Sequence, residues 1–250
     1  MELALERERN KSTIAVFSAL QLLLVVTMIV SLIRRKLNYA GLCLASMAAV
    51  MAPSLAERLL HIRIRPGMKN AIMIYAVAGP VGGNVFQLYY IVPFWDKLLH
   101  VFCGVLFAAF GYCVPDLLEP EQEHTTTMRC VCAVAVAMCI GALWEIYEFC
   151  GDQFFGLDMQ NDRVISGFSS YLLGDAGGER GAIQDITSVV VNGKELGVGG
   201  YIDIGLYDTM MDLVVCLAGA LGVCVYVKAR KREVQPMFVR VMPEEKPEMQ

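Results

Sequence analysis

Eight ionisable side chains stand at the ends of three apolar stretches of the sequence, at spacings that suit one face of a helix. The stretch FWDKLLHVFCG, residues 94–104, places Asp96 and His100 four residues apart, with Lys97 beside Asp96. Residues four apart are neighbours on an α-helix surface. This stretch therefore predicts a carboxylate and an imidazole on one helix face.

Two further stretches repeat this pattern with acids alone. In WEIYEFCGD, residues 144–152, Glu145, Glu148 and Asp152 follow the spacing i, i+3, i+7 and share a helical face. In YDTMMDLVV, residues 207–215, Asp208 and Asp212 are four apart. Each of the three predicted helices thus carries one acidic stripe.

The depth of these groups in a membrane separates them into two sets. At about 1.5 Å of rise per residue, His100, Glu145 and Asp212 lie about 7 to 11 Å below the ends of their helices. Because an Asp at the centre of a membrane helix costs ~2.5–3.5 kcal/mol, the deeper groups should face protein or a water-filled cavity. The deeper set is His100, Glu145, Glu148 and Asp212; Asp96, Lys97 and Asp152 are expected at the rim, and Asp208 lies between.

The first interpretation is a divalent metal centre. If all six carboxylates ionise, Lys97 offsets one charge, so the pocket must hold protons, a cation or a cationic ligand. Carboxylates with one imidazole suit Mg²⁺, Mn²⁺, Fe or Zn²⁺. Such a metal would polarise a phosphate or activate water for lipid-headgroup or cell-envelope chemistry. The predicted metal ligands are His100, Glu145, Glu148, Asp208 and Asp212, of which His100, Glu145 and Glu148 are the catalytic candidates.

Two other interpretations stay open. One is a proton- or cation-coupled transporter, because carboxylates inside membranes mark such paths. Against it, the other halves of these three helices are nearly uncharged, whereas a path needs ionisable groups on both sides of the midplane. The remaining interpretation is non-enzymatic: an envelope scaffold or sensor in which a polar cluster only sets how the helices pack. Small residues at Gly104, Gly141 and Gly219 would permit the close approach.

The elements that position these groups are apolar runs long enough to cross a bilayer. Hydrophobic residues make up 56% of the 250, above the roughly 45–50% of soluble domains. Since about 20 apolar residues span the hydrocarbon, we expect an all-α polytopic bundle of about six transmembrane helices. The predicted spans are residues 12–33, 38–56, 70–92, 94–115, 130–150 and 207–227.

Lys and Arg near the helix ends favour an orientation with both termini inside, although Arg34, Arg35 and Lys36 run against it. This divides the chain into a cytoplasmic N-terminus (1–11), a transmembrane domain (12–227) with an outer loop (154–206), and a basic segment with a disordered tail (228–250). A net charge of −4 without a basic groove disfavours nucleic acid. Membrane lipids are the expected partners, and the substrate would be lipid-linked or part of the envelope.

Two smaller features concern packing and turns. In ITSVVVNGKELGVG, β-branched residues flank Asn192-Gly193, which predicts a β-hairpin with a type I′ turn in the outer loop. Nearly all of the nine cysteines stand singly inside apolar runs, so we expect small core residues rather than a metal or disulfide framework.

The three charged motifs, in this order, resemble the YjdF-like bacterial inner membrane proteins, a multi-pass family without an established reaction. The resemblance covers about residues 55–225, except for the outer insertion between Asn161 and Tyr207. It rests on FWDKLLHVFCG, GALWEIYEFCGDQFFGLDMQ and YDTMMDLVVCLAGALG, with RIRPG before the third helix. A more distant similarity is to the VanZ-like envelope proteins, although the Asn usual in their last motif is missing here. The resemblance implies a helical bundle in the bacterial cytoplasmic membrane and leaves the chemistry open.

Overall fold

The computed structural model describes residues 2–59, 62–174, 177–230 and 238–240. The chain divides into two compact units: residues 1–141 together with 215–250, and residues 142–214. Helices α7 (Thr126–Phe155) and α8 (Leu206–Arg230) each run without interruption from one unit into the other.

Five helical segments of the described chain are long and apolar enough to cross a membrane. Their length and composition confirm the predicted helical membrane bundle, with five such spans where about six were predicted. The five spans are Lys11–Ile33 within α1 (Glu2–Ile33), α2 (Leu37–Leu59), Trp95–Leu118 across α5 (Trp95–Gly111) and α6 (Val114–Leu118), α7, and α8.

The third predicted span, about residues 70–92, differs from a single helix. It consists of α3 (Pro66–Val77), a π-helical segment η1 (Ala78–Val85) and the short α4 (Leu88–Ile91). Pro80 lacks the backbone N–H that a regular α-helix needs, and the wider hydrogen-bonding pattern of η1 follows at this point. Gln87, with φ of 59°, separates η1 from α4.

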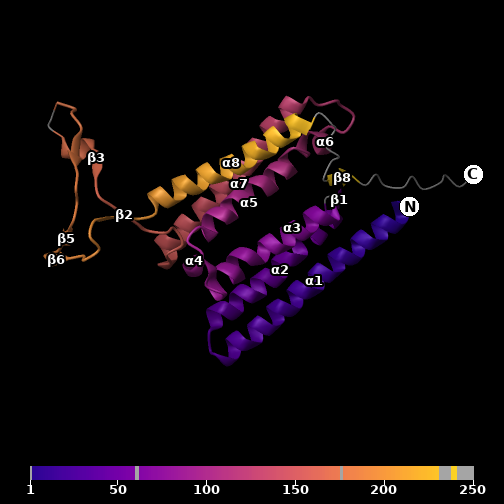
Figure 1. Cartoon of the computed structure of the whole chain (residues 1–250), viewed down its shortest axis with the longest axis horizontal. Helices are drawn as coiled ribbons and strands as arrows, with labels where there is room; N and C mark the ends of the chain where they lie inside the picture. Colours follow the sequence, from indigo (N-terminus) through magenta and orange to yellow (C-terminus); the bar gives the residue numbers. More distant parts are fainter. Residues whose placement is uncertain (1, 60–61, 175–176, 231–237, 241–250) are drawn as a thin grey trace, which may run out of the picture. The chain divides into compact units, whose positions relative to one another are not determined.

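Two of the apolar cores of the first unit lie among its long helices, and a third, smaller one consists of Ile62, Ile64 and Cys113. Helices α1, α2 and α3 pack around one of the two larger cores, in which Leu24, Cys43 and Val50 are fully buried (Figure 1). The second core lies among α5, α7 and α8 and consists mainly of small side chains, including Ala108, Ala133 and Ala220. Because its side chains are small, the second core lets three helix backbones approach closely.

Close backbone contacts in the second core confirm the predicted packing on small residues. A Cβ atom added at Gly104 of α5 would collide with the Cys216 carbonyl of α8, and one added at Gly219 would collide with the Val101 carbonyl. The Cys216 thiol also donates to the carbonyl oxygen of Ala137 on α7, with 3.7 Å between sulfur and oxygen. The three helices are therefore in register at the level of Cys216.

The cysteines of the described chain are all free, and six of the nine are buried. Cys130 and Cys224 face each other across α7 and α8, where the Cys224 thiol donates to the Cys130 carbonyl oxygen at 3.7 Å. The prediction of small core residues is confirmed for these six. Cys139 is exposed and is not a core residue.

Three short antiparallel strand pairs belong to the second unit. They are β2 (Arg163–Ile165) with β7 (Tyr201–Asp203), β3 (Phe168–Ser170) with β4 (Gly181–Ile183), and β5 (Val190–Val191) with β6 (Lys194–Glu195). The β5–β6 pair is the predicted hairpin: Asn192 and Gly193 have φ of 51° and 77°, as a type I′ turn requires. A 3₁₀ turn, η2 (Tyr171–Leu173), follows β3.

A fourth strand pair joins two distant parts of the first unit. Strand β1 (Ile62–Ile64) pairs with β8 (Phe238–Arg240), so these three residues of the predicted tail are ordered in a sheet. The remainder of that tail, 231–237 and 241–250, lies outside the described residues.

Candidate functional site

The predicted site residues divide between the two units. Asp96, Lys97 and His100 belong to the first unit, and the acids of α7 and α8 to the second. Their helices begin and end close to the predicted positions, because the apolar runs that define them are long and carry few charges.

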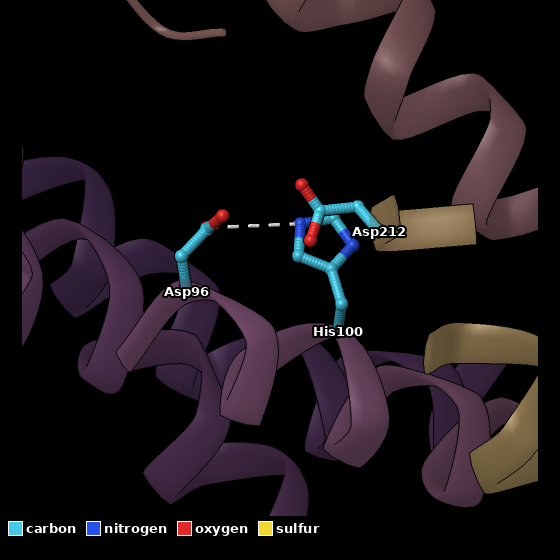
Figure 2. Close-up of side chains that lie close together, drawn as sticks. All are labelled: Asp96, His100 and Asp212. Carbon is cyan, nitrogen blue, oxygen red and sulfur yellow. Dashed lines mark ion pairs between the residues drawn. The ribbon is translucent and has the colours of Figure 1, made fainter. Parts of the chain in front are cut away.

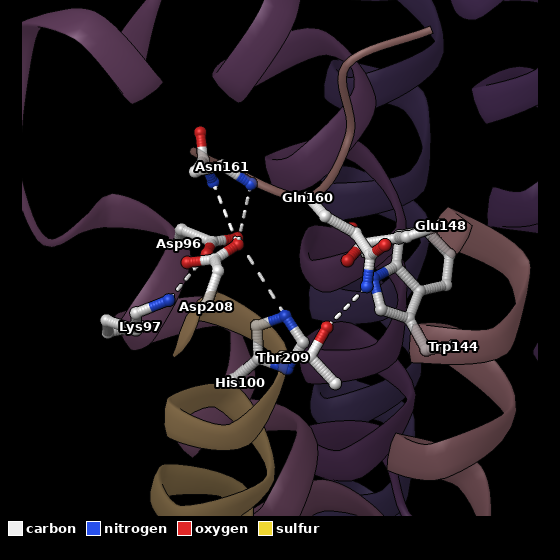
Figure 3. Close-up of polar contacts among 9 residues, drawn as sticks. All are labelled: Asp96, Lys97, His100, Trp144, Glu148, Gln160, Asn161, Asp208 and Thr209. Atoms are coloured by element: carbon white, nitrogen blue, oxygen red, sulfur yellow. Dashed lines mark hydrogen bonds and ion pairs between the residues drawn. The ribbon is translucent and has the colours of Figure 1, made fainter. Parts of the chain in front are cut away.

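His100 and Asp96 share a face of α5, as their spacing predicts. His100 Nε2 lies 3.8 Å from Asp96 Oδ1 (Figure 2). Lys97 Nζ lies 3.2 Å from Asp96 Oδ2 (Figure 3). His100 is 5% exposed, whereas the Asp96 side chain, in the first turn of the helix, is 19% exposed. A carboxylate in the first turn is favoured by the helix dipole. The imidazole is thus the deeper group and Asp96 the shallower.

The second unit contains four buried carboxylates. Glu145 and Glu148 on α7 are 4% and 7% exposed, and Asp208 and Asp212 on α8 are 9% and 0% exposed. These values confirm that the deeper acids face protein. Buried acids are rare unless they are paired, protonated or bound to a cation. This burial distinguishes them from charges that end a membrane helix in water.

Trp144 is a neighbour of the acidic stripe that the spacing alone did not single out. Its indole Nε1 donates to Glu148 Oε1 at 2.9 Å (Figure 3). The ring also lies against Tyr147, with 5.3 Å between centroids. The i, i+4 spacing of Trp144 and Glu148 is the signal that would have suggested this bond. The indole fixes the direction of one Glu148 oxygen.

Asp152 and Asp208 hold the segment that follows α7. The Asp152 carboxylate accepts hydrogen bonds from the backbone N–H groups of Met159 at 2.7 Å and Gln160 at 3.0 Å. Asp208 Oδ2 accepts from the backbone and side-chain nitrogens of Asn161, at 2.9 and 3.2 Å (Figure 3). Both acids therefore anchor the loop 156–161 in addition to any role at the site.

Gln160 and Asn161 of this loop hydrogen-bond to residues of α8, among them Thr209. These three residues were not predicted from the sequence to have a role. The Gln160 amide nitrogen donates to the Thr209 hydroxyl, so the loop is joined to the first turn of α8. The motif GLDMQN contains the first two, but nothing in its spacing indicates a partner 47 to 49 residues away.

Asp162 is a further acidic residue, directly after the 156–161 loop. Desolvation, followed by the charges of Asp158, Asp152 and Asp203, raises the pKa of Asp162 above its usual value. A raised carboxyl pKa means that the folded state binds this proton more tightly than the unfolded state. The contribution of Asp162 to stability is therefore most favourable in acid and is lost as pH rises through the folded pKa.

Replacing Asp152 with alanine is expected to loosen the 156–161 loop. The change removes two charge-assisted hydrogen bonds, each worth about 1.5–3 kcal/mol. Hydrogen exchange followed by mass spectrometry should show faster exchange of the Met159 and Gln160 amides. Asp158→Ala is the matched control, because Asp158 is exposed and lies in the same loop. Equal exchange in both variants would contradict an anchoring role for Asp152.

Comparison with known proteins places the chain among membrane proteins. No curated protein and no solved structure matches it. The sequence matches the family described as predicted membrane protein (DUF2238) over residues 16–233, a range that includes the charged motifs of α5, α7 and α8. The chain therefore belongs to this family of predicted membrane proteins.

Proposed function

We propose that His100, Glu145, Glu148, Asp208 and Asp212 form one divalent-cation site inside the membrane bundle. The observation that carries this proposal is burial: one imidazole and four carboxylates, each less than one tenth exposed, occur on membrane-spanning helices. Ionised groups at such depth are costly unless opposite charge compensates them. A bound cation provides that compensation for several acids together.

Continuity of α7 and α8 supports a shared site. His100 stands four residues before Gly104, and Asp212 stands four residues before Cys216, the residue whose carbonyl Gly104 approaches. Glu145 lies eight residues beyond Ala137, the acceptor of the Cys216 thiol. Side chains lean toward the N-terminus of their own helix. Glu145 would therefore lean toward the Ala137 end of α7, and Asp212 would lean away from Cys216, toward the start of the antiparallel α8. Both would approach the level of His100.

The ligand set suits a hard or borderline divalent cation. In the proposed arrangement, His100, Glu145 and Glu148 would supply one group of donor atoms, and Asp96, His100 and Asp212 would supply another. Oxygen ligands with one nitrogen fit Mg²⁺, Mn²⁺, Fe²⁺ or Zn²⁺. Asp96 would orient the imidazole from the rim, as outer carboxylates do for metal-binding histidines. Lys97 and Asp152 would complete that rim.

The proposed activity is chemistry on a phosphate-bearing lipid headgroup or a lipid-linked envelope substrate. A bound cation would supply charge stabilisation to the phosphate. Glu145, Glu148 and His100 are the residues proposed to touch the reacting group, with Trp144 holding Glu148 in position. We further propose a bacterial cytoplasmic membrane location with both termini inside, which puts the site near the outer leaflet. The resemblance to YjdF-like and, distantly, VanZ-like proteins supports an envelope role.

A structural role is the second candidate, because a specific observation favours it. Asp152 and Asp208 each accept two hydrogen bonds from the 156–161 loop, so part of the acidic cluster has a packing function. On this alternative the protein would be an envelope scaffold or sensor. Proton- or cation-coupled transport has less support, because Ala, Cys and Val dominate the core of α5, α7 and α8.

Metal analysis of the purified protein tests the cation site. Protein in detergent should be stripped with EDTA, dialysed against Mn²⁺ or Zn²⁺, freed of unbound ion by gel filtration and measured by atomic emission. We expect about one ion per chain, and loss of at least tenfold in affinity when Glu145 and Glu148 are both changed to glutamine. The amide keeps the shape of each side chain and removes its charge.

The matched control changes Glu121 and Glu123, which are both exposed, to glutamine. That variant should bind the ion like the unchanged protein. If no ion is retained by the unchanged protein, or if the two double variants retain it equally, the cation site is wrong and the structural role stands.

A further inference from the structure

A large apolar cavity lies in the first unit, separate from the acidic residues. Its volume is about 1140 Å³, and its walls come from α3, α5 and α8. Ligand pockets in proteins commonly measure about 300–1,000 Å³, so this space is large enough for an amphipathic small molecule.

The walls of the cavity are apolar over most of their length. Val101, Phe102 and Val105 line it from α5, and Gly219, Gly222 and Val223 line it from α8. Both helices are membrane spans. Lipid acyl chains are the apolar material available at this depth, and smooth walls of this composition offer them only van der Waals contact.

One end of the cavity is polar and positively charged. Ser12, Arg65 and Asn70 line it there, together with Tyr226. The Arg230 guanidinium lies over the Tyr226 ring, 5.0 Å from its centroid, which places a second cation beside the same end. None of the residues described as lining the cavity is acidic. The charge of this end complements an anion.

The first turn of α3 adds hydrogen-bond donors at that end. Arg65 is the N-cap of α3, and Pro66 and Gly67 follow it along the cavity wall. A Cβ atom at Gly67 would meet nothing within 4 Å, so the backbone there is open to a ligand. Backbone N–H groups of a first helical turn favour phosphate oxygens.

We propose that this cavity binds one membrane phospholipid with an anionic headgroup. The acyl chain would lie along α5 and α8, and the headgroup phosphate would lie against Arg65 and the start of α3. Arginine pairs with phosphate through two parallel N–H donors, which lysine does not reproduce. Basic pockets between membrane helices are a recurring geometry for anionic lipid headgroups. This site is independent of the acidic cluster and of the function proposed for it.

Retention of defined lipids tests the proposal. Purified full-length protein should be incubated in detergent with either dioleoylphosphatidylglycerol or dioleoylphosphatidylcholine, passed through gel filtration and weighed by native mass spectrometry. We expect about one phosphatidylglycerol per chain and roughly tenfold weaker retention of phosphatidylcholine. Arg65→Gln should weaken phosphatidylglycerol binding about tenfold, the effect of losing one charged hydrogen-bonding partner. Arg58→Gln, at an exposed residue outside the cavity wall, should leave binding unchanged.

A second variant fills the cavity without touching its charge. A Cβ at Gly222 would meet nothing within 4 Å, so Gly222→Leu should fold normally and project its side chain into the acyl-chain path. Gly41→Leu, at an equally open helical glycine outside the cavity, is its control. We expect only Gly222→Leu to lose the lipid. Equal retention of the two lipids, or retention by Arg65→Gln equal to that of Arg58→Gln, would overturn the proposal even if Gly222→Leu does not fold.

Discussion

Changing Glu145 and Glu148 together to glutamine is expected to raise the thermal stability of the protein in EDTA and to lower it, relative to the unchanged protein, in saturating Mn²⁺. The four carboxylates of α7 and α8 are at most 9% exposed, and in the proposed site they would repel one another when no cation is bound. Two neutral amides reduce that cost. The amide introduced at position 148 can still accept the Trp144 hydrogen bond through its carbonyl oxygen.

Mn²⁺ should reverse this order of stability, because at the proposed site it would bind only to the protein that keeps the Glu145 and Glu148 carboxylates. An ion at 100 times its dissociation constant stabilises the folded state by about 2.7 kcal/mol. Thermal unfolding followed by tryptophan fluorescence, with and without the ion, measures the crossover. Glu121→Gln with Glu123→Gln should follow the unchanged protein in both buffers. A double variant at 145 and 148 that is less stable in both buffers would instead support the structural role.

Replacing Gly104 with alanine is expected to destabilise the bundle by about 1–3 kcal/mol or more, the usual range for overpacking a tight core. The added methyl group would collide with the backbone carbonyl of Cys216, which cannot rotate away as a side chain could. Helices α5 and α8 would have to separate. Unfolding of the purified variant in detergent measures the effect. His100, one turn away on α5, would move with the helix.

Gly41→Ala serves as the control for the Gly104 variant. Gly41 is also helical, but a Cβ there meets nothing within 4 Å. Alanine favours the helix by roughly 0.5–1 kcal/mol over glycine, so this variant should be slightly more stable than the unchanged protein. The two substitutions are the same chemically and should have opposite signs. A loss of stability at Gly41 equal to that at Gly104 would show that the close approach is not responsible.

The sequence by itself predicts the class of this protein and the faces of its helices. Uninterrupted apolar runs longer than the bilayer core can form little but membrane helices, so five of the predicted spans agree with α1, α2, α5 with α6, α7 and α8. The i, i+4 spacing of Asp96 and His100 brings them together whatever surrounds them. Asn192-Gly193 forms the predicted turn because local backbone preferences decide it.

Only the tertiary structure decided the features that depend on residues far apart in the chain. The bonds from Asp152 and Asp208 to the 156–161 loop, and the cavity beside Arg65, are not visible in any single stretch. Helical spacing says which side chains share a face, since it follows from the repeat of one helix. Which loop lies over an acid, and which helices leave space between them, depends on how separate elements pack, and no local preference determines that.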